Sequence, residues 1–395
     1  MRRFLFATWL IIVMSRPVHA QEMEVPDSNR ARLLYQTEKL LEDVTQDATD
    51  SQLADLLARL EENPLDLNYA TEAKLRQIPG ITQSVAYRII AARTPSGFQS
   101  IAEIRHIDGM TDDLYEIIRK FTTITSSEVS GNMVGGSLRS RTVSDLQDRR
   151  GYLDGTYRGS SLKSYQRLIL NYGEPRSRTK KNNRWVETGF LVEKDAGETR
   201  LNDFQAGYAM VNAPEISSKV ILGDFVVEAA EGLVLWRSIG FSKGSEVVST
   251  LEKSGGGIRP YLSTDENLFF RGGAFEWESD GVLLSAFYSN KKMTASINAN
   301  GMITSLIADG YHRTASEEAK MDNAKESLLG FRTSFEFARG LSFGATAFQA
   351  NFSHPLLIGG TEASSGTRMR AGGLDFRYSD KRLTLFSEIA TSTSG

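Results

Sequence analysis

The segment FFRGGAFEWESDGVLLSAFYSNK, at positions 269–291, decides the fold of most of this chain. Two stretches of mixed polarity lie on either side of Ser279-Asp280-Gly281. An Asp-Gly pair between two such stretches is typical of a tight β-hairpin turn. The alternation is imperfect across the glycine pair at 272–273, but residues 341–352 alternate smoothly between a small apolar face and a polar or mixed face. These segments predict antiparallel β-strands joined by short turns.

Segments of this kind recur through the glycine-rich region 128–395. The clearest candidate strands are Leu162–Tyr172, Arg184–Lys194, Asp203–Val211, Phe269–Ser279, Val282–Lys291, Leu328–Ala338, Leu341–Phe352, Met369–Tyr378 and Leu383–Ala390. Short junctions at Arg339-Gly340 and Ser379-Asp380-Lys381 contrast with longer connections such as 289–326. This asymmetry, with aromatic residues near the strand ends, is typical of outer-membrane barrels. We therefore predict an antiparallel outer-membrane β-barrel over 128–395, with a soluble secreted β-sandwich as the alternative.

The composition agrees with this fold and excludes several others. The chain has 395 residues and no cysteine, which excludes disulfides, thiolate nucleophiles and Cys-ligated metals. Its mean hydropathy is −0.29, and no internal apolar run is long enough for a transmembrane helix. Barrel strands alternate polar and apolar residues, so they have an average composition. The formal net charge of −3 is not that of a protein that binds polyanions through its bulk charge.

Residues 1–20 are predicted to be a secretory signal peptide. Arg2 and Arg3 precede an apolar stretch from Phe4 to Met14, and Val18-His19-Ala20 provides a small-x-small cleavage pattern. The apolar stretch is too short to cross about 30 Å of hydrocarbon, which argues against a membrane anchor. We therefore expect the mature chain to be exported.

Residues 21–62 are predicted to form an acidic helical neck. Apolar residues recur at three- and four-residue steps from Leu33 to Leu60, as expected for two amphipathic helices. Acidic residues outnumber basic ones in this segment, so it would repel a nucleic-acid backbone. The expected role is a solvated hairpin that holds the next module.

Residues 63–125 contain a duplicated helix-hairpin-helix pattern. Ile78-Pro79-Gly80-Ile81-Thr82 interrupts one pair of helical patterns, and Asp108-Gly109-Met110-Thr111 interrupts a second pair after Gly97-Phe98. Each reversal needs glycine at a positive φ, and each threonine can cap the following helix through its hydroxyl. An internal duplication is the simplest explanation.

The run NPLDLNYATEAKLRQIPGITQSVAYRIIAARTPSGFQSIAEIRHIDGM, at 63–110, resembles the tandem helix-hairpin-helix domain of the competence DNA receptor family. The family pattern is Asn-x-Ala-Thr, Pro-Gly-Ile-Gly, Gly-x-Phe and Gly-Ile-Gly. The resemblance implies that the hairpin amides hold a double-stranded DNA phosphate without reading bases. The DNA-binding residues that follow from the resemblance and from the nearby basic side chains are Gly80, Ile81, Thr82, Arg88, Arg93, Gly109, Met110 and Thr111.

Three departures weaken the inheritance of DNA binding. Thr82 and Thr111 replace the second glycine of each hairpin, which would let a phosphate approach the backbone. Asp112 and Asp113 lie in the first turn of the last helix, where they oppose a phosphate. The module is also electrically neutral, whereas non-specific DNA binding depends on excess positive charge. Structural or protein-docking use is therefore preferred, with DNA contact as the alternative.

Three motifs of the C-terminal region extend the resemblance. With the helix-hairpin-helix pair, Gly223-Asp224-Phe225, 231–236 and 310–317 resemble Bacteroidetes-type outer-membrane helix-hairpin-helix proteins, which implies a location more than a chemistry. In the last motif, His312, Arg313 and Glu317 are expected to form a charge-assisted cluster that closes a long loop or plug. A structural role is preferred over a catalytic one.

The expected function is non-enzymatic. No metalloprotease, nucleophile-elbow or phosphate-loop motif is present, and no metal or cofactor is predicted. The preferred interpretation is a binding, docking or transport barrel in outer-membrane lipid, whose periplasmic helical module docks a periplasmic protein. A DNA-uptake component is the alternative, and an outer-membrane enzyme is the third. Since the chain stops at Gly395 in or just after a strand, a truncated barrel stays open as an interpretation.

Overall fold

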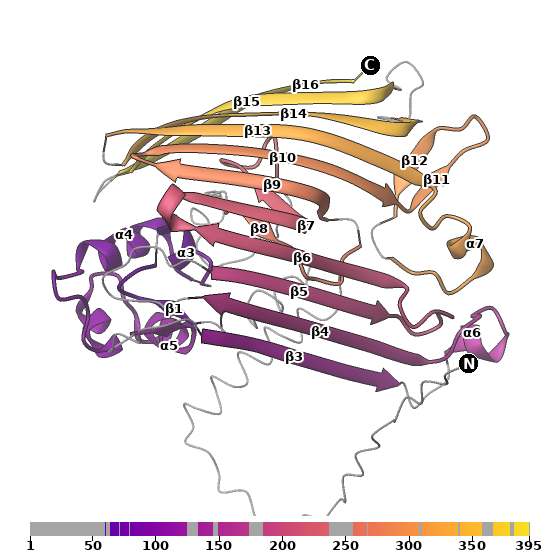
Figure 1. The fold of residues 1–395 in the computed structure, drawn as a ribbon, viewed down its shortest axis with the longest axis horizontal. Coiled ribbons are helices and arrows are strands. Elements are labelled where there is room, and N and C mark those ends of the chain that lie inside the picture. The colour runs from indigo at the N-terminus through magenta and orange to yellow at the C-terminus, as the bar shows by residue number, and fades with distance from the viewer. Residues whose placement is uncertain are drawn as a thin grey trace, which may run out of the picture.

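The computed structural model describes residues 60, 64–70, 72–78, 80–124, 133–144, 149–173, 185–236, 256–266, 268–307, 310–338, 340–357, 366–379 and 383–394. The predicted signal peptide and, apart from Leu60, the acidic neck lie outside this set. A small helical module stands at one end of a large curved sheet (Figure 1).

Four short helices lie within residues 64–124 of the helical module, as far as the structure describes them. They are α3 (Glu72–Leu75), α4 (Gln83–Ala91), the 3-10 helix η1 (Ile101–His106) and α5 (Asp112–Phe121). The strands β1 (Leu65–Asp66) and β2 (Thr122–Thr123) pair in parallel and join the two ends of the module. Its buried core consists of Leu60, Leu65, Leu67, Ala70, Leu75, Ile78, Ile81, Val85, Ala86, Ile89, Phe98, Ile104, Tyr115, Ile118 and Phe121. The module thus has a hydrophobic core of its own.

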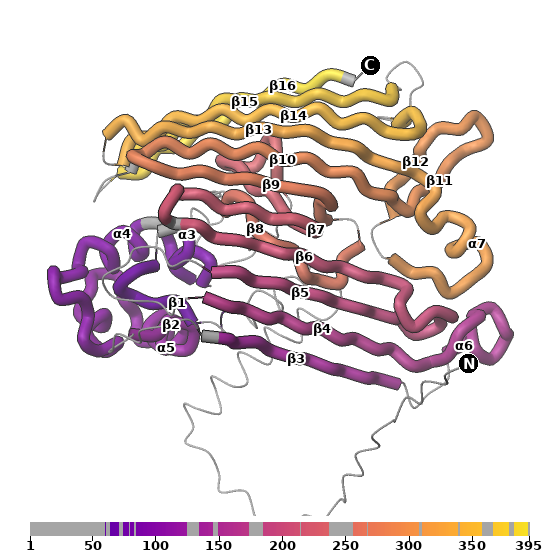
Figure 2. The backbone as a smooth tube through the Cα atoms, in the orientation of Figure 1, coloured from indigo at the N-terminus to yellow at the C-terminus, as the bar shows by residue number. Residues whose placement is uncertain are grey.

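The remainder of the described chain is built on one 14-stranded sheet. Its long strands are β3 (Met133–Ser144), β4 (Leu162–Gly173), β5 (Trp185–Lys194), β6 (Phe204–Ala213), β7 (Ser218–Glu228), β9 (Phe270–Ser279), β10 (Val282–Met293), β13 (Ala324–Ala338), β14 (Leu341–Leu356), β15 (Gly366–Ser379) and β16 (Thr384–Ser394). They lie side by side in this order, each antiparallel to the next. The short strands β8 (Gly257–Pro260), β11 (Ala295–Ile297) and β12 (Ile303–Leu306) pair with β7, β12 and β14. The trace in Figure 2 follows this up-and-down path.

The two ends of the sheet differ in their connections. At the end beside the helical module, β9 and β10 are joined through Asp280-Gly281, and η2 (Pro214–Ile216) lies between β6 and β7. At the other end, longer connections carry α6 (Arg150–Leu153) and α7 (Ala315–Glu318). Apart from the longer 174–184 connection between β4 and β5, the predicted contrast between short turns and long loops is therefore present, with the helical module on the side of the short turns.

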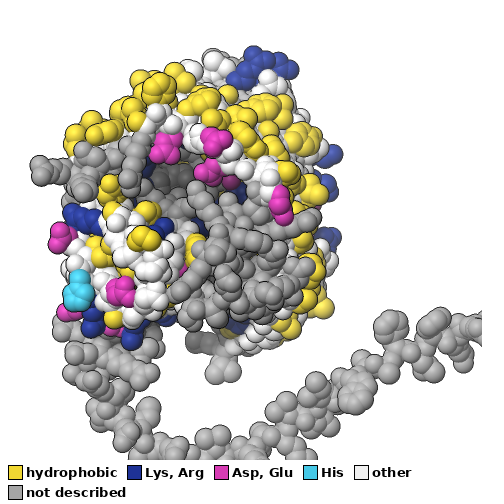
Figure 3. Space-filling model, turned by 60° about the vertical axis from the view of Figure 1, so that its left-hand side comes forward, with side chains coloured by type: hydrophobic (Ala, Val, Ile, Leu, Met, Phe, Trp, Pro, Cys, Tyr) yellow, Lys and Arg dark blue, Asp and Glu magenta, His cyan; other side chains and the backbone are white. Residues whose placement is uncertain are grey.

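The two faces of the sheet have opposite polarity. We call inner the face that packs against 229–236 and 256–269, and outer the opposite face. The outer face exposes large apolar side chains on every long strand: Val134, Leu138, Leu168, Leu170, Tyr172, Val186, Phe190, Val211, Val220, Leu222, Phe275, Leu284, Tyr288, Leu329, Phe331, Phe335, Phe337, Phe343, Leu374, Leu385 and Ile389. The inner face buries charged and polar groups, including Arg167, Glu193, Lys291 and Thr346. Hydrophobic side chains spread over the outer surface in Figure 3.

The nine strands predicted from the sequence correspond to β4, β5, β6, β9, β10, β13, β14, β15 and β16, with ends shifted by a few residues. The sequence patterns missed β3 and β7, because glycine pairs and a run of buried residues interrupt their alternation. The predicted antiparallel sheet is confirmed, whereas its closure into a barrel stays a prediction: among the described residues the sheet is open, since β3 and β16 each pair along one edge only. No helix in the described part of the chain combines the length and apolarity needed to span a membrane.

Candidate functional site

The two hairpins of the helical module are built in the same way. Gly80 and Gly109 have φ values of 83° and 82°, which only glycine adopts without strain. The hydroxyls of Thr82 and Thr111 each accept a hydrogen bond of 3.2 Å from the backbone three residues later. These contacts confirm the predicted threonine caps, and the two hairpins share the same local geometry, as expected for an internal duplication.

The hairpins also pack against each other reciprocally. A Cβ atom on Gly80 would lie 3.2 Å from Leu114, in the helix after the second hairpin. A Cβ atom on Gly109 would lie 4.0 Å from Val85 and 2.8 Å from the Arg88 guanidinium, in the helix after the first. Each glycine therefore has a conformational role and a packing role.

The basic residues proposed for DNA contact make internal contacts. Arg88 Nη1 donates to the Asp108 carbonyl at 2.6 Å and so ties the two hairpins together. Arg93 donates from Nε to Leu67 at 2.9 Å and from Nη2 to Ala70 at 2.5 Å. Burial lowers the pKa of Arg93, against the opposing charge of Asp66.

The remaining predicted hairpin residues differ in exposure. Gly80, Gly109 and Thr111 are exposed, Thr82 and Met110 are partly exposed, and Ile81 is buried in the module core. The structure therefore places a pair of exposed turns on one small domain, with Arg88 and Arg93 holding its shape. Their role as DNA ligands stays a prediction.

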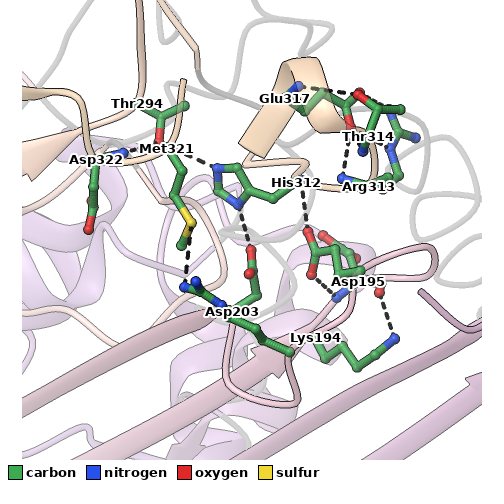
Figure 4. A network of polar contacts seen from close by, with 12 residues as sticks. Lys194, Asp195, Asp203, Thr294, His312, Arg313, Thr314, Glu317, Met321 and Asp322 are labelled. Atoms are coloured by element: carbon green, nitrogen blue, oxygen red, sulfur yellow. Dashed lines mark hydrogen bonds and ion pairs between the residues drawn. The ribbon is translucent and has the colours of Figure 1, made fainter. Parts of the chain in front are cut away.

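A second polar cluster lies among the long connections at the opposite end of the sheet. His312 Nδ1 bonds to the Asp203 carboxylate at 2.5 Å, and its backbone N–H donates to Glu198 Oε1 at 3.1 Å (Figure 4). Glu198 also accepts from the backbone of Asp195 at 2.7 Å. The 195–203 and 310–323 connections are thereby joined through buried groups.

The electrostatics of this cluster follow from burial and crowded carboxylates. Burial lowers the pKa of His312, but the hydrogen bond and charge of Asp203 outweigh it, so the net pKa is raised. Burial, with a contribution from Asp203, raises the pKa of Glu198 to about 7. Burial and the neighbouring carboxylates raise the pKa of Glu266, which packs against Gly310, to about 9.

Arg313 and Glu317 form a separate part of the same loop. Their side chains pair at 2.8 Å, while the Arg313 guanidinium lies 4.0 Å from the ring centroid of Tyr311 and 5.1 Å from that of Tyr157. Thr314 and Glu317 form a capping box at the start of α7. The structure brings Arg313 and Glu317 together and gives His312 different partners. The sequence patterns did not identify Glu198, Asp203 and Glu266. Glu198 and Asp203 lie more than a hundred positions before His312 in the sequence, and Glu266 lies about fifty positions before it.

Glu198, Asp203 and His312 are also the described residues that could hold a metal ion. One ligand atom from each lies within 4.8 Å of the other two. All three groups already have hydrogen-bond partners within the protein, however, so their geometry is explained without an ion. Their hydrogen bonds join the 195–203 connection to the 310–323 connection.

The space against the inner face is filled by the chain itself. Residues from 226–235 and 258–270 pack with the inner side chains of β4 to β10 into one hydrophobic cluster. Phe225, Phe270 and Phe287 meet at its centre, with ring centroids 5.8–6.5 Å apart. Beyond this cluster, Arg377 on β15 bonds to Glu231 at 2.5 Å, and Arg332 pairs with Asp375 at 2.8 Å. The described chain therefore fills the space against β4 to β10 with a hydrophobic cluster, and charged side chains line the inner face of β13 and β15.

Comparisons with known proteins add the following. Residues 61–123 match a family model described as a helix-hairpin-helix motif. The structure of Salmonella typhi OmpF in complex with daunomycin aligns over 67% of this chain and 79% of the OmpF chain, at 11% sequence identity and a TM-score of 0.24. A TM-score of this size does not establish a common fold. No curated protein matches the chain.

Proposed function

We propose that this chain is an outer-membrane β-barrel protein with a periplasmic helix-hairpin-helix module, and that it binds or docks a partner without catalysing a reaction. The observation that carries the proposal is the reversed polarity of the sheet: large apolar side chains are exposed on the outer face of every long strand, and charged groups are buried inside. A water-soluble sheet would place these faces the other way round. A sheet that spans a bilayer needs apolar side chains on its lipid-facing surface, and it needs a hydrogen-bond partner for every backbone N–H and C=O group.

The placement of the module follows from the connections. Outer-membrane barrels have short periplasmic turns and long extracellular loops. The helical module lies at the end with the short turns, which supports a periplasmic location for it. Its separate hydrophobic core and its neutral charge suit the docking of a periplasmic protein. Closure between β3 and β16, directly or through additional strands, is part of the proposal.

The test is insertion of the full chain into membranes. The chain should fractionate with outer membranes and resist extraction by alkaline carbonate. Phe331→Arg, on the outer face of β13, should reduce folding into lipid, since a mid-bilayer Arg costs about 2–4 kcal/mol. Ser334→Arg, on the same strand but facing inward at a partly exposed position, controls for the arginine side chain. A carbonate-soluble chain, or equal effects of both substitutions, would contradict the proposal.

DNA uptake is the second candidate, because the family match covers both hairpins and their turns are exposed. The full chain would then bind double-stranded DNA with an affinity that falls steeply with salt. Thr111→Asp, at an exposed turn position, would reduce this affinity, while Gln99→Asp, exposed and outside the turns, would not. No affinity at low salt would remove this candidate.

A further inference from the structure

Four exposed basic residues gather on the outer face of neighbouring strands, at the end with the long loops. Lys292 on β10 and Lys325 on β13 are direct cross-strand partners. Arg368 and Arg370 follow on β15, separated from β13 by β14 alone. Like charges placed directly opposite each other on one face destabilise a sheet, so the pair of lysines is unfavourable without an anion between them.

The two arginines are held towards the lysines. Arg368 Nε donates to Asn351 at 3.3 Å, and Arg370 Nε donates to Gln349 at 2.9 Å, so both guanidinium groups lie across β14. The acid that faces this group among the described residues is Asp322, 3.5 Å from Lys292 Nζ, with both side chains at least half exposed. The patch therefore has four positive charges and one exposed negative charge.

The neighbouring strands do not share this excess. Arg271 on β9 is neutralised by Asp224 at 2.7 Å. The outward residues at the same end of β4 and β6 include the uncharged Gln166 and Gln205. Among the described strands, the outward-facing positive charge at this border is thus concentrated on β10, β13 and β15, whereas other exposed basic residues at this end, such as Arg149 and Arg150, lie in connections.

An apolar groove begins directly beside the patch. Ala347 and Gly372 lie two residues along their strands from Gln349 and Arg370, a distance of about 7 Å. Small side chains form the floor, and larger ones form the walls: the outward lining residues include Phe331, Thr333, Ala345, Ala347, Gly372 and Leu374. The groove runs away from the charged border into the apolar part of the outer face.

We propose that the patch and the groove form one binding site for an anionic phospholipid, whose phosphate charge is not balanced by a cation in the same headgroup. The headgroup phosphate lies on Arg368 and Arg370, the positive charges of Lys292 and Lys325 lie nearer the border, and one acyl chain lies in the groove. Guanidinium groups bind phosphate through paired N–H donors, while Lys contributes as a point charge. The proposal rests on the proposed membrane location, since a lipid reaches this surface only from a bilayer.

The experiment uses the full chain in micelles of a non-ionic detergent. Binding of dioleoylphosphatidylglycerol and dioleoylphosphatidylcholine, which share their acyl chains, is measured by native mass spectrometry. Phosphatidylglycerol should bind more tightly. Arg368→Gln with Arg370→Gln should reduce its affinity by roughly tenfold, equivalent to ~1.4 kcal/mol. Arg149→Gln with Arg150→Gln, which removes two exposed positive charges at the same end of the sheet, should leave the affinity unchanged.

The acyl-chain half of the site has its own variants. Ala347→Trp fills the groove and should weaken phosphatidylglycerol binding, whereas Ala209→Trp, on the outer face of β6, should not. Equal binding of the two lipids, indifference to the arginine pair, or indifference to Ala347→Trp would each overturn the proposal. Full competition by inorganic phosphate would show an ion site only and would also overturn it.

Failure of the two proposals is distinguishable. A chain that never enters membranes fails the fractionation test and removes both. A chain that inserts, yet does not distinguish the two lipids, removes the lipid site and leaves the barrel.

Discussion

The backbone N–H of Glu231 donates to the Glu388 carboxylate at 3.0 Å, although the two residues are 157 positions apart. The same carboxylate oxygen accepts from Leu233 N at 3.0 Å, and the Glu231 side chain bonds to Arg377. The segment 229–236 therefore crosses from the packed half of the interior to β15 and β16. Val234 and Leu235 anchor its other side in the hydrophobic cluster.

Removal of the Glu388 carboxylate should release this segment. Glu388→Ala leaves two backbone donors without their acceptor, so we expect faster hydrogen exchange in 229–236 and a higher conductance in planar bilayers. Glu388→Gln keeps an acceptor oxygen at the same place and should behave almost as the native chain. Unchanged exchange in Glu388→Ala would show that the apolar anchor alone holds the segment.

Arg332 on β13 and Asp375 on β15 form an ion pair on the inner face. Two contacts, of 2.8 and 3.1 Å, join the side chains, and Arg332 also donates to Thr346. Arg332→Met alone leaves a buried carboxylate unpaired and should lower the free energy of unfolding by about 3–5 kcal/mol. Urea titration of both proteins in lipid vesicles measures this difference in the free energy of unfolding.

The matched control for this prediction is the double variant. Arg332→Met with Asp375→Leu removes both charges, so much of the stability should return. If the double variant is as unstable as the single one, the pair contributes through shape and packing and not through its charges.

The glycines of the two hairpins should be equally sensitive to substitution. Gly80→Ala and Gly109→Ala each place a Cβ at a positive φ, which costs about 1–2 kcal/mol. Both should lower the melting temperature of the helical module, followed by helical circular dichroism. Gly155→Ala, at φ 72° but with open space around its Cβ and outside the module, should leave the module transition in place. A large effect at only one hairpin would contradict the reciprocal packing.

Local patterns predicted the elements but not how they meet. The Asp-Gly turn at 280–281 and the duplicated hairpins at Gly80 and Gly109 are short-range features, and the structure reproduces them. The partners of His312 come from another connection, at Asp203 and Glu198, and no spacing rule relates them. Barrel closure depends on the pairing of β3 with strands at the far end of the chain. This is a long-range relationship that alternation cannot specify.

Glu266 gives the loop cluster a pH dependence with a defined sign. An unfolded glutamate loses its proton near pH 4.5, whereas folding raises the pKa of Glu266 to about 9. Between these values the folded cluster binds more protons than the unfolded chain. Its stability therefore falls as the pH rises through this window. The glutamine side chain in Glu266→Gln is neutral at every pH, so the stability of the loop cluster should fall less steeply as the pH rises.

The expected result is slower hydrogen exchange at Tyr311 and His312 in Glu266→Gln than in the native chain at pH 8. The difference should correspond to at least about 1 kcal/mol, since one pKa unit is ~1.36 kcal/mol. At pH 4 the two proteins should exchange alike, because Glu266 is then protonated in both states. Glu318→Gln, which removes a carboxylate from the connection that carries Tyr311 and His312, is the control. A native chain whose loops are more protected at pH 8 than at pH 5, after correction for intrinsic exchange, would reverse the sign and contradict the prediction.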